Sequence, residues 1–496
     1  MLITSRRLRA ALLAAAAATL VAATVPAPAP PVALGIGDPL FPHLGNPGYD
    51  VRAYDISFTY SGSNSKPLDA VTKIDAVATE RLDRVNLDFS RGAVASVEVN
   101  GERAAFETAG EDLIVTPGAP VHEGWPLRIT VRHTSDPQPK EGPDGGWVRT
   151  RDGLAMANQA DAAHRVFPCN DHPADKALFT FRVTAPRGVT AVANGLPVGE
   201  AGKAAGGATW TYRTRHPMAT ELAQVSLGRS TVVRRNGPNG LPVRDVVPTA
   251  DRTRLEPWLK KTPAQLEWME RQIGRYPLEA YGLLVADAET GFELETQTLS
   301  LFERSLFTRS DLPAWYVESI MVHELAHQWF GNSVSPRTWS DLWLNEGHAT
   351  WYEARYAEDH AKRPLEARMR QAYAQSDAMR AQGGPPAAPR GPAPGKKISI
   401  FRPVVYDGSA LVLYALRQEI GKEAFGQLER RWVRDHRDAS ATTADFTNLA
   451  SEVAGRDLTA FFKEWLYGKK TPPMPGHPDW RTEAAKTSAQ AGTARR

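Results

Sequence analysis

Short alternations of apolar and polar residues run through the first half of the chain, between about residues 35 and 235. A period of two is typical of strands that bury one face. Clusters of Gly, Pro and Asn separate these segments, as at Asn100-Gly101 and Asn194-Gly195, and such clusters mark turns. The pattern predicts an all-β region with strands near residues 54–60, 94–99, 127–131, 178–183, 209–212 and 224–233.

The pattern changes after about Asp251, where apolar residues recur every three or four positions. That spacing predicts helices, which we expect at residues 255–276, 315–330, 340–357, 410–420, 423–436, 443–454 and 458–467, with a short apolar strand at 281–286. Gly331-Asn332 is a candidate C-cap. The Gly/Pro-rich segment 383–397 is expected to be a surface loop. The fold class is therefore multidomain β plus α/β, with a β domain at 35–242, a mainly helical domain at 243–470 and a frayed tail at 471–496.

The N-terminus has the pattern of a secretory signal. Arg6, Arg7 and Arg9 precede an apolar run over residues 10–25, and small residues and prolines follow. This pattern predicts a cleaved signal peptide over residues 1–34 and a secreted protein. The run is shorter than the roughly 20 residues of a membrane span, so we expect no stable span after cleavage. An uncleaved anchor is the alternative.

Composition and charge narrow the function classes. The chain carries 59 Lys and Arg against 56 Asp and Glu, and loss of the signal would leave it near neutral. This balance does not favour a nucleic-acid binder. Cys169 is the one cysteine, so no intrachain disulfide can form, and we expect it to be buried and unreactive. For His164 and His172 we expect packing or surface roles.

The strongest chemical signal is MVHELAHQWFGN at residues 321–332. On a helix, His323 and His327 are one turn apart on the same face, and Glu324 lies between them. Two imidazoles that hold a metal and a carboxylate that serves as general base form the zincin arrangement. The alternative is a surface helix with two solvated histidines.

The next helix offers a third ligand. Glu346 lies in WLNEGHATWYE, after the apolar Leu342-Trp343-Leu344, and a buried carboxylate needs a partner. A catalytic zinc takes three protein ligands and one open position. The sequence therefore predicts one Zn²⁺ per chain on His323, His327 and Glu346. His348 points to another side of this helix, and Thr350 is either a hydrogen-bond partner of a ligand or an ordinary helix threonine.

These motifs closely resemble the aminopeptidase N family of zinc metallopeptidases, the gluzincin aminopeptidases. FPCNDHPADKALFTFRV, AVANG and PMATELAQVSLG, at residues 167–183, 191–195 and 217–228, resemble the family's N-terminal domain. The resemblance covers most of the mature chain. It implies a saddle-like β domain followed by a thermolysin-like zinc catalytic domain, in a short member of the family. It also implies peptide substrates that have a free N-terminus.

The resemblance assigns further residues. GFELETQT at residues 291–298 is similar to the family's GxMEN motif, with the glutamate kept as Glu295, which then binds the substrate α-amine. Gln159 falls where many members of the family place a second, acidic anchor for the α-amine. The amide of Gln159 can accept a hydrogen bond from the amine but carries no charge. Tyr406, in VVYDGSALVLYALR, matches the tyrosine that donates to the oxyanion. Without the resemblance, Glu295 is equally well a solvated charge, and Tyr406 a packed residue like Tyr414.

The sequence thus predicts a secreted zinc aminopeptidase, with Glu324 and Tyr406 as catalytic residues and Glu295 and Gln159 as substrate-binding residues. One alternative is a zinc endopeptidase of the thermolysin type, which has no need of Glu295. Another is a catalytically silent binding protein on the same fold. Nothing in the sequence calls for the epoxide chemistry of one branch of the family.

Overall fold

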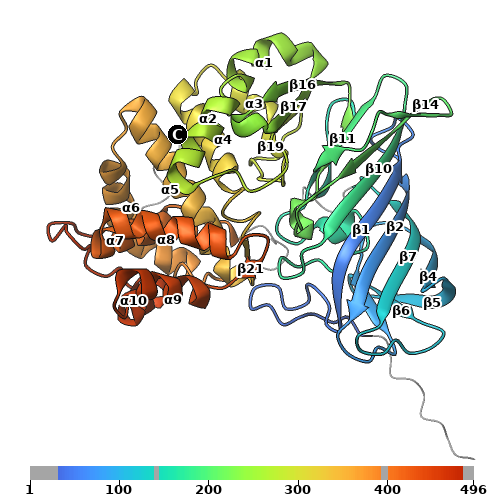
Figure 1. Cartoon of the computed structure of the whole chain (residues 1–496), viewed down its shortest axis with the longest axis horizontal. Coiled ribbons are helices and arrows are strands. Elements are labelled where there is room, and N and C mark those ends of the chain that lie inside the picture. The colour runs from blue at the N-terminus through green and yellow to red at the C-terminus, as the bar shows by residue number, and fades with distance from the viewer. Residues whose placement is uncertain (1–31, 139–144, 393–399, 484–496) are drawn as a thin grey trace, which may run out of the picture.

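The computed structural model describes residues 32–138, 145–392 and 400–483. A curved β part and a mainly helical part lie side by side (Figure 1). The predicted order, a β-rich domain followed by a mainly helical domain, is confirmed. Residues 1–31 of the predicted signal lie outside the described residues.

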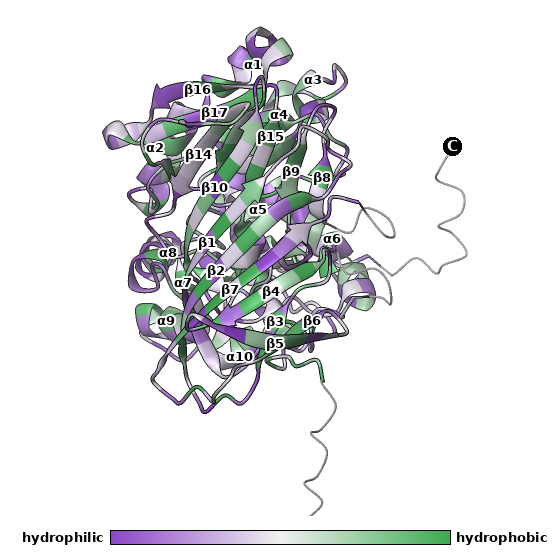
Figure 2. Ribbon diagram, turned by 90° about the vertical axis from the view of Figure 1, so that its right-hand side faces the viewer, coloured by the Kyte–Doolittle hydropathy of each residue, from purple (hydrophilic) through white to green (hydrophobic). Residues whose placement is uncertain are grey.

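The largest sheet has the strand order β12-β14-β10-β1-β2-β7-β4-β5-β6-β3, with β13 paired to β14. These strands are β1 (Tyr49–Thr59), β2 (Leu68–Ala78), β3 (Val85–Asp88), β4 (Val94–Val99), β5 (Glu102–Ala109), β6 (Asp112–Thr116), β7 (Pro126–Ser135), β10 (Leu178–Pro186), β12 (Leu196–Pro197), β13 (Gly202–Ala204) and β14 (Gly207–Arg213). Most neighbours are antiparallel, but β1 and β10 are parallel. Ile56 and Phe58 of β1 are buried. The alternation of green and purple in Figure 2 follows this pleat and explains the period of two in the sequence.

A second sheet, with the order β11-β15-β9-β8, shares the core of the β part. Its strands are β8 (Gly146–Arg149), β9 (Leu154–Ala157), β11 (Thr190–Ala193) and β15 (Val225–Gly228). The single strand expected at 224–233 is wrong, because the chain leaves this sheet after β15 and enters another sheet as β16 (Ser230–Asn236).

A third sheet, β16-β17-β18-β19, joins the two parts. It adds β17 (Pro242–Pro248), β18 (Leu283–Ala286) and β19 (Ser300–Glu303). Leu284 and Leu301 belong to the core of the β part, whereas Leu283 and Phe302 belong to the core of the helical part. Residue 242, the predicted domain boundary, begins β17, and β16 pairs with β17 throughout. The sheet that continues into the helical part therefore begins at about Ser230.

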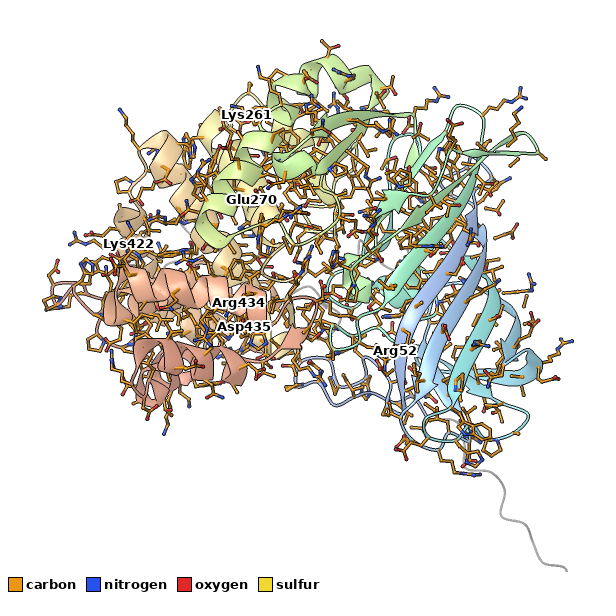
Figure 3. All side chains as sticks on the ribbon, in the orientation of Figure 1. Arg52, Lys261, Glu270, Lys422, Arg434 and Asp435 are labelled. Carbon is orange, nitrogen blue, oxygen red and sulfur yellow. The ribbon has the colours of Figure 1, made fainter. Side chains whose placement is uncertain are left out.

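The helices are α1 (Arg252–Leu259), α2 (Thr262–Ile273), α3 (Arg304–Thr308), α4 (Ala314–Ala326), α5 (Leu342–Ala361), α6 (Leu365–Gly383), α7 (Asp407–Ile420), α8 (Lys422–Asp435), α9 (Thr443–Ala454) and α10 (Thr459–Tyr467). A two-stranded ladder of β20 (Ser335–Pro336) and β21 (Ser440–Ala441) links α4 to the end of α8. Charged side chains cover the outer faces, and Figure 3 labels Lys261 and Glu270 at α2 and Lys422, Arg434 and Asp435 on α8.

Two helix predictions differ from the structure. The helix expected at 255–276 is two helices, α1 and α2, which meet at Lys260 and Lys261. No helix was predicted where α6 lies, and α6 buries mostly small or polar residues besides Leu365, Met369 and Tyr373. Because few large apolar side chains mark its buried face, its helical period is weak.

The segment expected to be a frayed tail packs in its described part. Met474 and Trp480 are each 4% exposed, and the Trp480 ring stacks on Tyr414 at 5.8 Å. Thr471 donates its backbone N–H to Asp377 on α6. The expectation is therefore wrong for residues 471–483, because these two apolar side chains join the helical core.

A third, smaller core lies between the two parts. Leu40 and Phe41 pack with Trp339 and Val405, and the rings of Phe41 and Trp339 meet edge to face at 5.9 Å. Of the segment expected to be a loop at 383–397, residues 384–392 lack regular structure and 393–399 lie outside the described residues. Among the residues that the structure describes, no helix is long and apolar enough to cross a membrane.

Candidate active site

The two motif histidines lie at the C-terminal end of α4. The helix ends at Ala326, earlier than predicted, and His327 is its C-cap with helical φ and ψ of −55° and −27°. The one-turn spacing from His323 is therefore kept, and the two rings lie 4.8 Å apart. Gly331, the expected cap, follows in a tight turn with φ of +125°.

Glu346 reaches the histidines from α5, which packs against α4. Its Oε2 lies 3.3 Å from Nε2 of His323 and 3.5 Å from Nε2 of His327. Two ligand atoms that are each about 2.0–2.1 Å from a tetrahedral zinc lie roughly 3.3–3.4 Å apart. Oε2 of Glu346 is buried without a hydrogen-bond donor among the described residues. The three side chains therefore fit a zinc ion, which supports the predicted ligand set.

In the metal-free site, the charge of each carboxylate and each histidine depends strongly on the charges of its neighbours. Burial opposes ionisation of Glu346, but the two histidines outweigh it and lower its pKa to about 2. Burial also opposes protonation of His327, yet Glu295 and Glu346 raise its pKa to about 9. Protons and zinc therefore compete for the same nitrogen atoms.

Glu324 faces the same cavity and is 5% exposed. Burial raises its pKa to about 8, opposed by the nearby histidines. Its Oε2 has no hydrogen-bond partner among the described residues. A carboxylate in this position is free to hydrogen-bond a water held at the metal, as a general base requires.

A second layer of polar groups orients the ligands. Nδ1 of His327 donates to Oδ1 of Asn345 at 2.5 Å, and Nδ1 of His323 donates to Oε2 of Glu353 at 3.2 Å. Because Nδ1 is used in each ring, both Nε2 atoms face Glu346 and are free to bind the metal. Such partners fix the tautomer and the ring orientation of metal-binding histidines.

The layer continues through Arg368 of α6. Its guanidinium donates to Oε1 of Glu353 at 2.7 Å and to Oδ1 of Asp407 at 3.1 Å. Sequence reasoning missed these residues and Asn345. Glu353 had a signal, because it lies two helical turns after Glu346 on the same face. Arg368 had none, since its helix was not predicted.

The structure brings the two expected amine anchors together. Gln159, which follows β9, donates its Nε2 to Oε1 of Glu295 at 2.8 Å. The same oxygen accepts from Nδ2 of Asn345 at 3.2 Å and lies 3.8 Å from Nδ1 of His327. The family resemblance implies an amine anchor at a strand edge for Glu295. It lies instead in a loop before β19, where only the neighbouring Leu294 forms a bridge, to Leu301.

Tyr406 is the N-cap residue of α7, and its ring lies 6.1 Å from that of His323. Burial, with the charges of nearby glutamates, raises the pKa of its phenol well above the ordinary value. The hydroxyl therefore keeps its proton at neutral pH and is able to donate. Tyr414, by contrast, is buried against Trp480 and His477, outside the metal cavity.

These groups meet in one cavity of about 550 Å³. It is lined by all seven predicted site residues, Gln159, Glu295, His323, Glu324, His327, Glu346 and Tyr406. The metal ligands come from two helices, the tyrosine from the start of a third, and the anchors from the loop before β19 and from the β part. The remaining wall includes Glu293, Tyr316, Phe401 and Arg368.

His348 and Thr350, also singled out in the sequence, do not join the predicted ligand group. His348 is buried, stacks on Phe330 at 4.1 Å and donates from Nδ1 to the carbonyl of Leu344. Thr350 lines the cavity, but its hydroxyl makes no hydrogen bond with the described residues.

The three residues singled out in the β part are all buried there. His164 pairs with Asp171 at 2.6 Å, and His172 pairs with Asp38 at 3.1 Å, which agrees with packing roles. Cys169 is free and fully buried, as expected.

A two-histidine, one-glutamate site with a free glutamate beside it, placed between a β part and a helical part, defines the class of zinc metallopeptidases. Residues 258–465 match the sequence model of the Peptidase family M1 domain, and residues 154–222 match that of the Peptidase M1 N-terminal domain. Together the two matches cover more than half of the chain. The protein belongs to peptidase family M1.

Similar proteins of known structure or curated sequence agree. An M1 zinc metallopeptidase from Deinococcus radiodurans is 27% identical, with a TM-score of 0.76 over 89% of this chain and 98% of that one. Glutamyl aminopeptidase of Mus musculus is 25% identical over 72% of this chain and 39% of its own length. Probable aminopeptidase 1 of Saccharolobus solfataricus is 23% identical over 86% of this chain and 54% of its own. The chain thus spans about half or less of these curated relatives.

Proposed function

We propose that this protein is a zinc-dependent aminopeptidase that removes the N-terminal residue of peptides. The observation that carries this proposal is the pair of Glu295 and Gln159 beside the metal site, with Glu295 3.8 Å from His327. A carboxylate next to the scissile position attracts a free α-ammonium group through a charge-assisted hydrogen bond. An endopeptidase has no use for this anchor.

The roles of the other residues follow from their positions. When bound, zinc supplies Lewis-acid polarisation of a water and of the scissile carbonyl. Glu324 accepts the proton of the attacking water and returns it to the leaving amine. Tyr406 donates its hydroxyl hydrogen to the developing oxyanion. Asn345 and Glu353 keep the two imidazoles in the ligand orientation.

Relatives support the proposal. Those that match include proteins named glutamyl aminopeptidase, leucyl aminopeptidase and aminopeptidase N. A glutamate-to-alanine mutant of the Deinococcus radiodurans protein has been crystallised with a Tyr-Ser-Ala substrate, and a mutant of a two-domain M1 zinc metallopeptidase with L-arginine. We extend an N-terminal peptidase activity to this chain because its anchors lie in the same cavity as the ligands.

The test compares an aminoacyl reporter with its N-acetylated twin, with and without a chelator. We expect cleavage of the free-amine reporter only, and loss of activity on chelation. Glu295→Ala should cost at least roughly tenfold in kcat/KM on the free amine, since each ~1.4 kcal/mol is tenfold. Gln159→Ala should cost less, because an amide carries no charge. Glu289→Gln, an exposed carboxylate outside the cavity, is the matched control.

Two results would redirect the proposal. If the wild type cleaves both twins comparably, the anchor has no role and a zinc endopeptidase takes its place. If the zinc-loaded protein turns over none of a panel of aminoacyl reporters, the chain is a silent binding protein on this fold.

We also propose that the chain is exported. The support is the run of Arg6, Arg7 and Arg9 followed by an apolar segment and small residues, which is typical of a cleaved signal. N-terminal sequencing of material recovered outside the cytoplasm should find a start between about Ala23 and Ile36. A membrane-bound form that keeps Met1 would contradict this proposal.

A further inference from the structure

A second cavity, of about 450 Å³, adjoins the metal cavity. Tyr316, Glu353, Arg368 and Asp407 line both. The rest of its wall comes from the first turn of α4, the end of α5, the turn that follows it and one side of α6, including Trp315, Arg363, Ala367, Gln371 and Met379. We call this cavity the α4–α6 groove.

The order of the site residues along α4 indicates that a bound peptide would run from the metal site into this groove. Glu295 contacts the C-terminal end of α4, at His327, whereas Trp315 lies at the N-terminal end, with His323 between them. A peptide with its amine at Glu295 and its scissile carbonyl at the histidines therefore runs back along α4 toward Trp315. Eight helical residues separate His323 from Trp315, or about 12 Å at ~1.5 Å per residue. That length is the span of roughly three or four extended residues.

The positive charges of the groove are not equivalent. Arg368 is engaged by two carboxylates, those of Glu353 and Asp407. Arg363, in the turn between α5 and α6, is exposed, and its guanidinium lies 4.7 Å from the centre of the Trp315 ring. Its side chain makes no ion pair or hydrogen bond with any other described residue. The contact with the ring fixes the orientation of the guanidinium and leaves its N–H groups available to donate hydrogen bonds to a ligand.

We propose that, given the aminopeptidase function above, the α4–α6 groove binds the part of the peptide that follows the scissile bond. Arg363 pairs there with a carboxylate three or four residues beyond that bond. The carboxylate is either the C-terminus of a short peptide or an acidic side chain of a longer one. Arg363 is then a specificity-determining residue that favours such substrates.

The first experiment uses alanine peptides of increasing length, each with a free C-terminal carboxylate or as the amide. Peptides whose carboxylate falls three or four residues beyond the first bond should be cleaved with roughly three- to tenfold higher kcat/KM than their amides, mainly through KM. Shorter and longer pairs should differ less. Long amidated peptides with Glu or Gln at the same position test the side-chain source.

Substitutions test whether Arg363 causes the preference for the carboxylate. Arg363→Gln should remove most of the preference for the carboxylate, and Arg363→Lys should restore part of it. The control is Arg370→Gln on the adjoining helix α6, whose side chain is 66% exposed and lies outside the groove. It should keep the wild-type preference. Added salt should weaken the preference, because a partly exposed charge pair is screened.

The outcomes separate the two proposals. Equal rates within every carboxylate–amide pair and also within the Glu–Gln pairs, or a preference that Arg363→Gln leaves intact, would overturn the groove assignment while reporter cleavage upholds the aminopeptidase. An effect confined to terminal carboxylates, or to Glu side chains, identifies the source. Calorimetric binding of the same peptides to zinc-loaded Glu324→Gln tests the groove without turnover. Equal affinity within the carboxylate–amide pairs and within the Glu–Gln pairs would also overturn it.

Discussion

Three glutamates around the metal site differ in charge because their neighbours differ. Histidines lower the pKa of Glu346 against its burial, and Arg368 with His323 does the same for Glu353, each to about 2. For Glu324 burial outweighs the charges of the same histidines and raises its pKa to about 8. Carboxylates that are separated in this way take different roles. Glu346 suits a ligand, and Glu324 suits a base.

The role of Glu324 predicts a clean separation of metal binding from turnover. Glu324→Gln should bind zinc at one ion per chain and lose roughly 10²–10⁴-fold in kcat, the usual contribution of a general base. His323→Ala should lose both metal and activity. Metal analysis together with steady-state kinetics on an aminoacyl reporter checks both variants. A near-normal kcat for Glu324→Gln would remove this residue from the chemistry.

Tyr406 makes a second prediction at this scale. Tyr406→Phe should leave the melting temperature nearly unchanged and lower kcat by roughly 10²–10³-fold, as expected for the loss of one oxyanion donor. Tyr414→Phe, on the same helix but outside the metal cavity, is the control. A loss of only a few-fold in kcat for Tyr406→Phe would leave this tyrosine with a packing role.

Among the secondary-structure elements, the site depends on the close approach of the turn after α4 to α5. A Cβ on Gly331 would lie 2.1 Å from Oδ1 of Asn345. Asn345 holds His327 through this oxygen and Glu295 through its amide nitrogen. The absence of a side chain at Gly331 therefore allows one asparagine to orient both a metal ligand and the proposed amine anchor.

This contact predicts the effect of Gly331→Ala. The positive φ of +125° and the clash should lower the free energy of unfolding by roughly 1–3 kcal/mol. Displacement of Asn345 should weaken zinc binding by roughly 10–100-fold. Gly274→Ala is the matched control, since Gly274 has φ of +114° and open space around it. It should lose stability and keep its zinc affinity. Equal zinc affinity in both variants would contradict the proposed role of Asn345.

Over the whole molecule, the site is complete only where the two parts meet. Gln159 follows a strand of the β part, and Glu295 precedes a strand of the sheet that both cores share. Lys176 adds a further link, because its ammonium donates to the carbonyls of Asn332 and Ser333 beyond α4. Relative movement of the parts would separate the anchors from the metal, so their common packing is a condition for the proposed activity.

Proton competition at the metal site predicts the pH dependence of zinc binding. The pKa values of His323 and His327 are raised in the metal-free protein, that of His327 to about 9. Their protonation therefore stabilises the metal-free fold fully below the unfolded pKa of about 6.5, and this contribution is lost as the pH rises through about 9. Zinc needs neutral imidazoles, so its affinity should fall as the pH is lowered from 9.

Calorimetric zinc titrations between pH 6 and 9, in buffers of different ionisation heat, check this linkage. We expect one to two protons released per zinc near neutral pH, and an affinity that changes by up to roughly tenfold per pH unit for each proton. A zinc affinity that is independent of pH, with no proton release, would show that the histidines are neutral before the metal binds.

The sequence by itself determined the division into a β part and a helical part, and the candidate metal ligands. Both depend on local periodicity: alternation along strands such as β4, and one turn between His323 and His327. The catalytic roles of Glu324 and Tyr406, and those of the two anchors, stay predictions that their shared cavity supports.

Only the tertiary structure decided the rest. Helix α6 has a weak apolar pattern, yet it supplies Arg368 to the layer behind His323. The packing of Trp480, the split of residues 224–233 between two sheets and the meeting of Gln159 with Glu295 all join segments far apart in the chain. Local patterns record which face of an element is buried. They do not record which distant element buries it, because that depends on the packing of the whole chain.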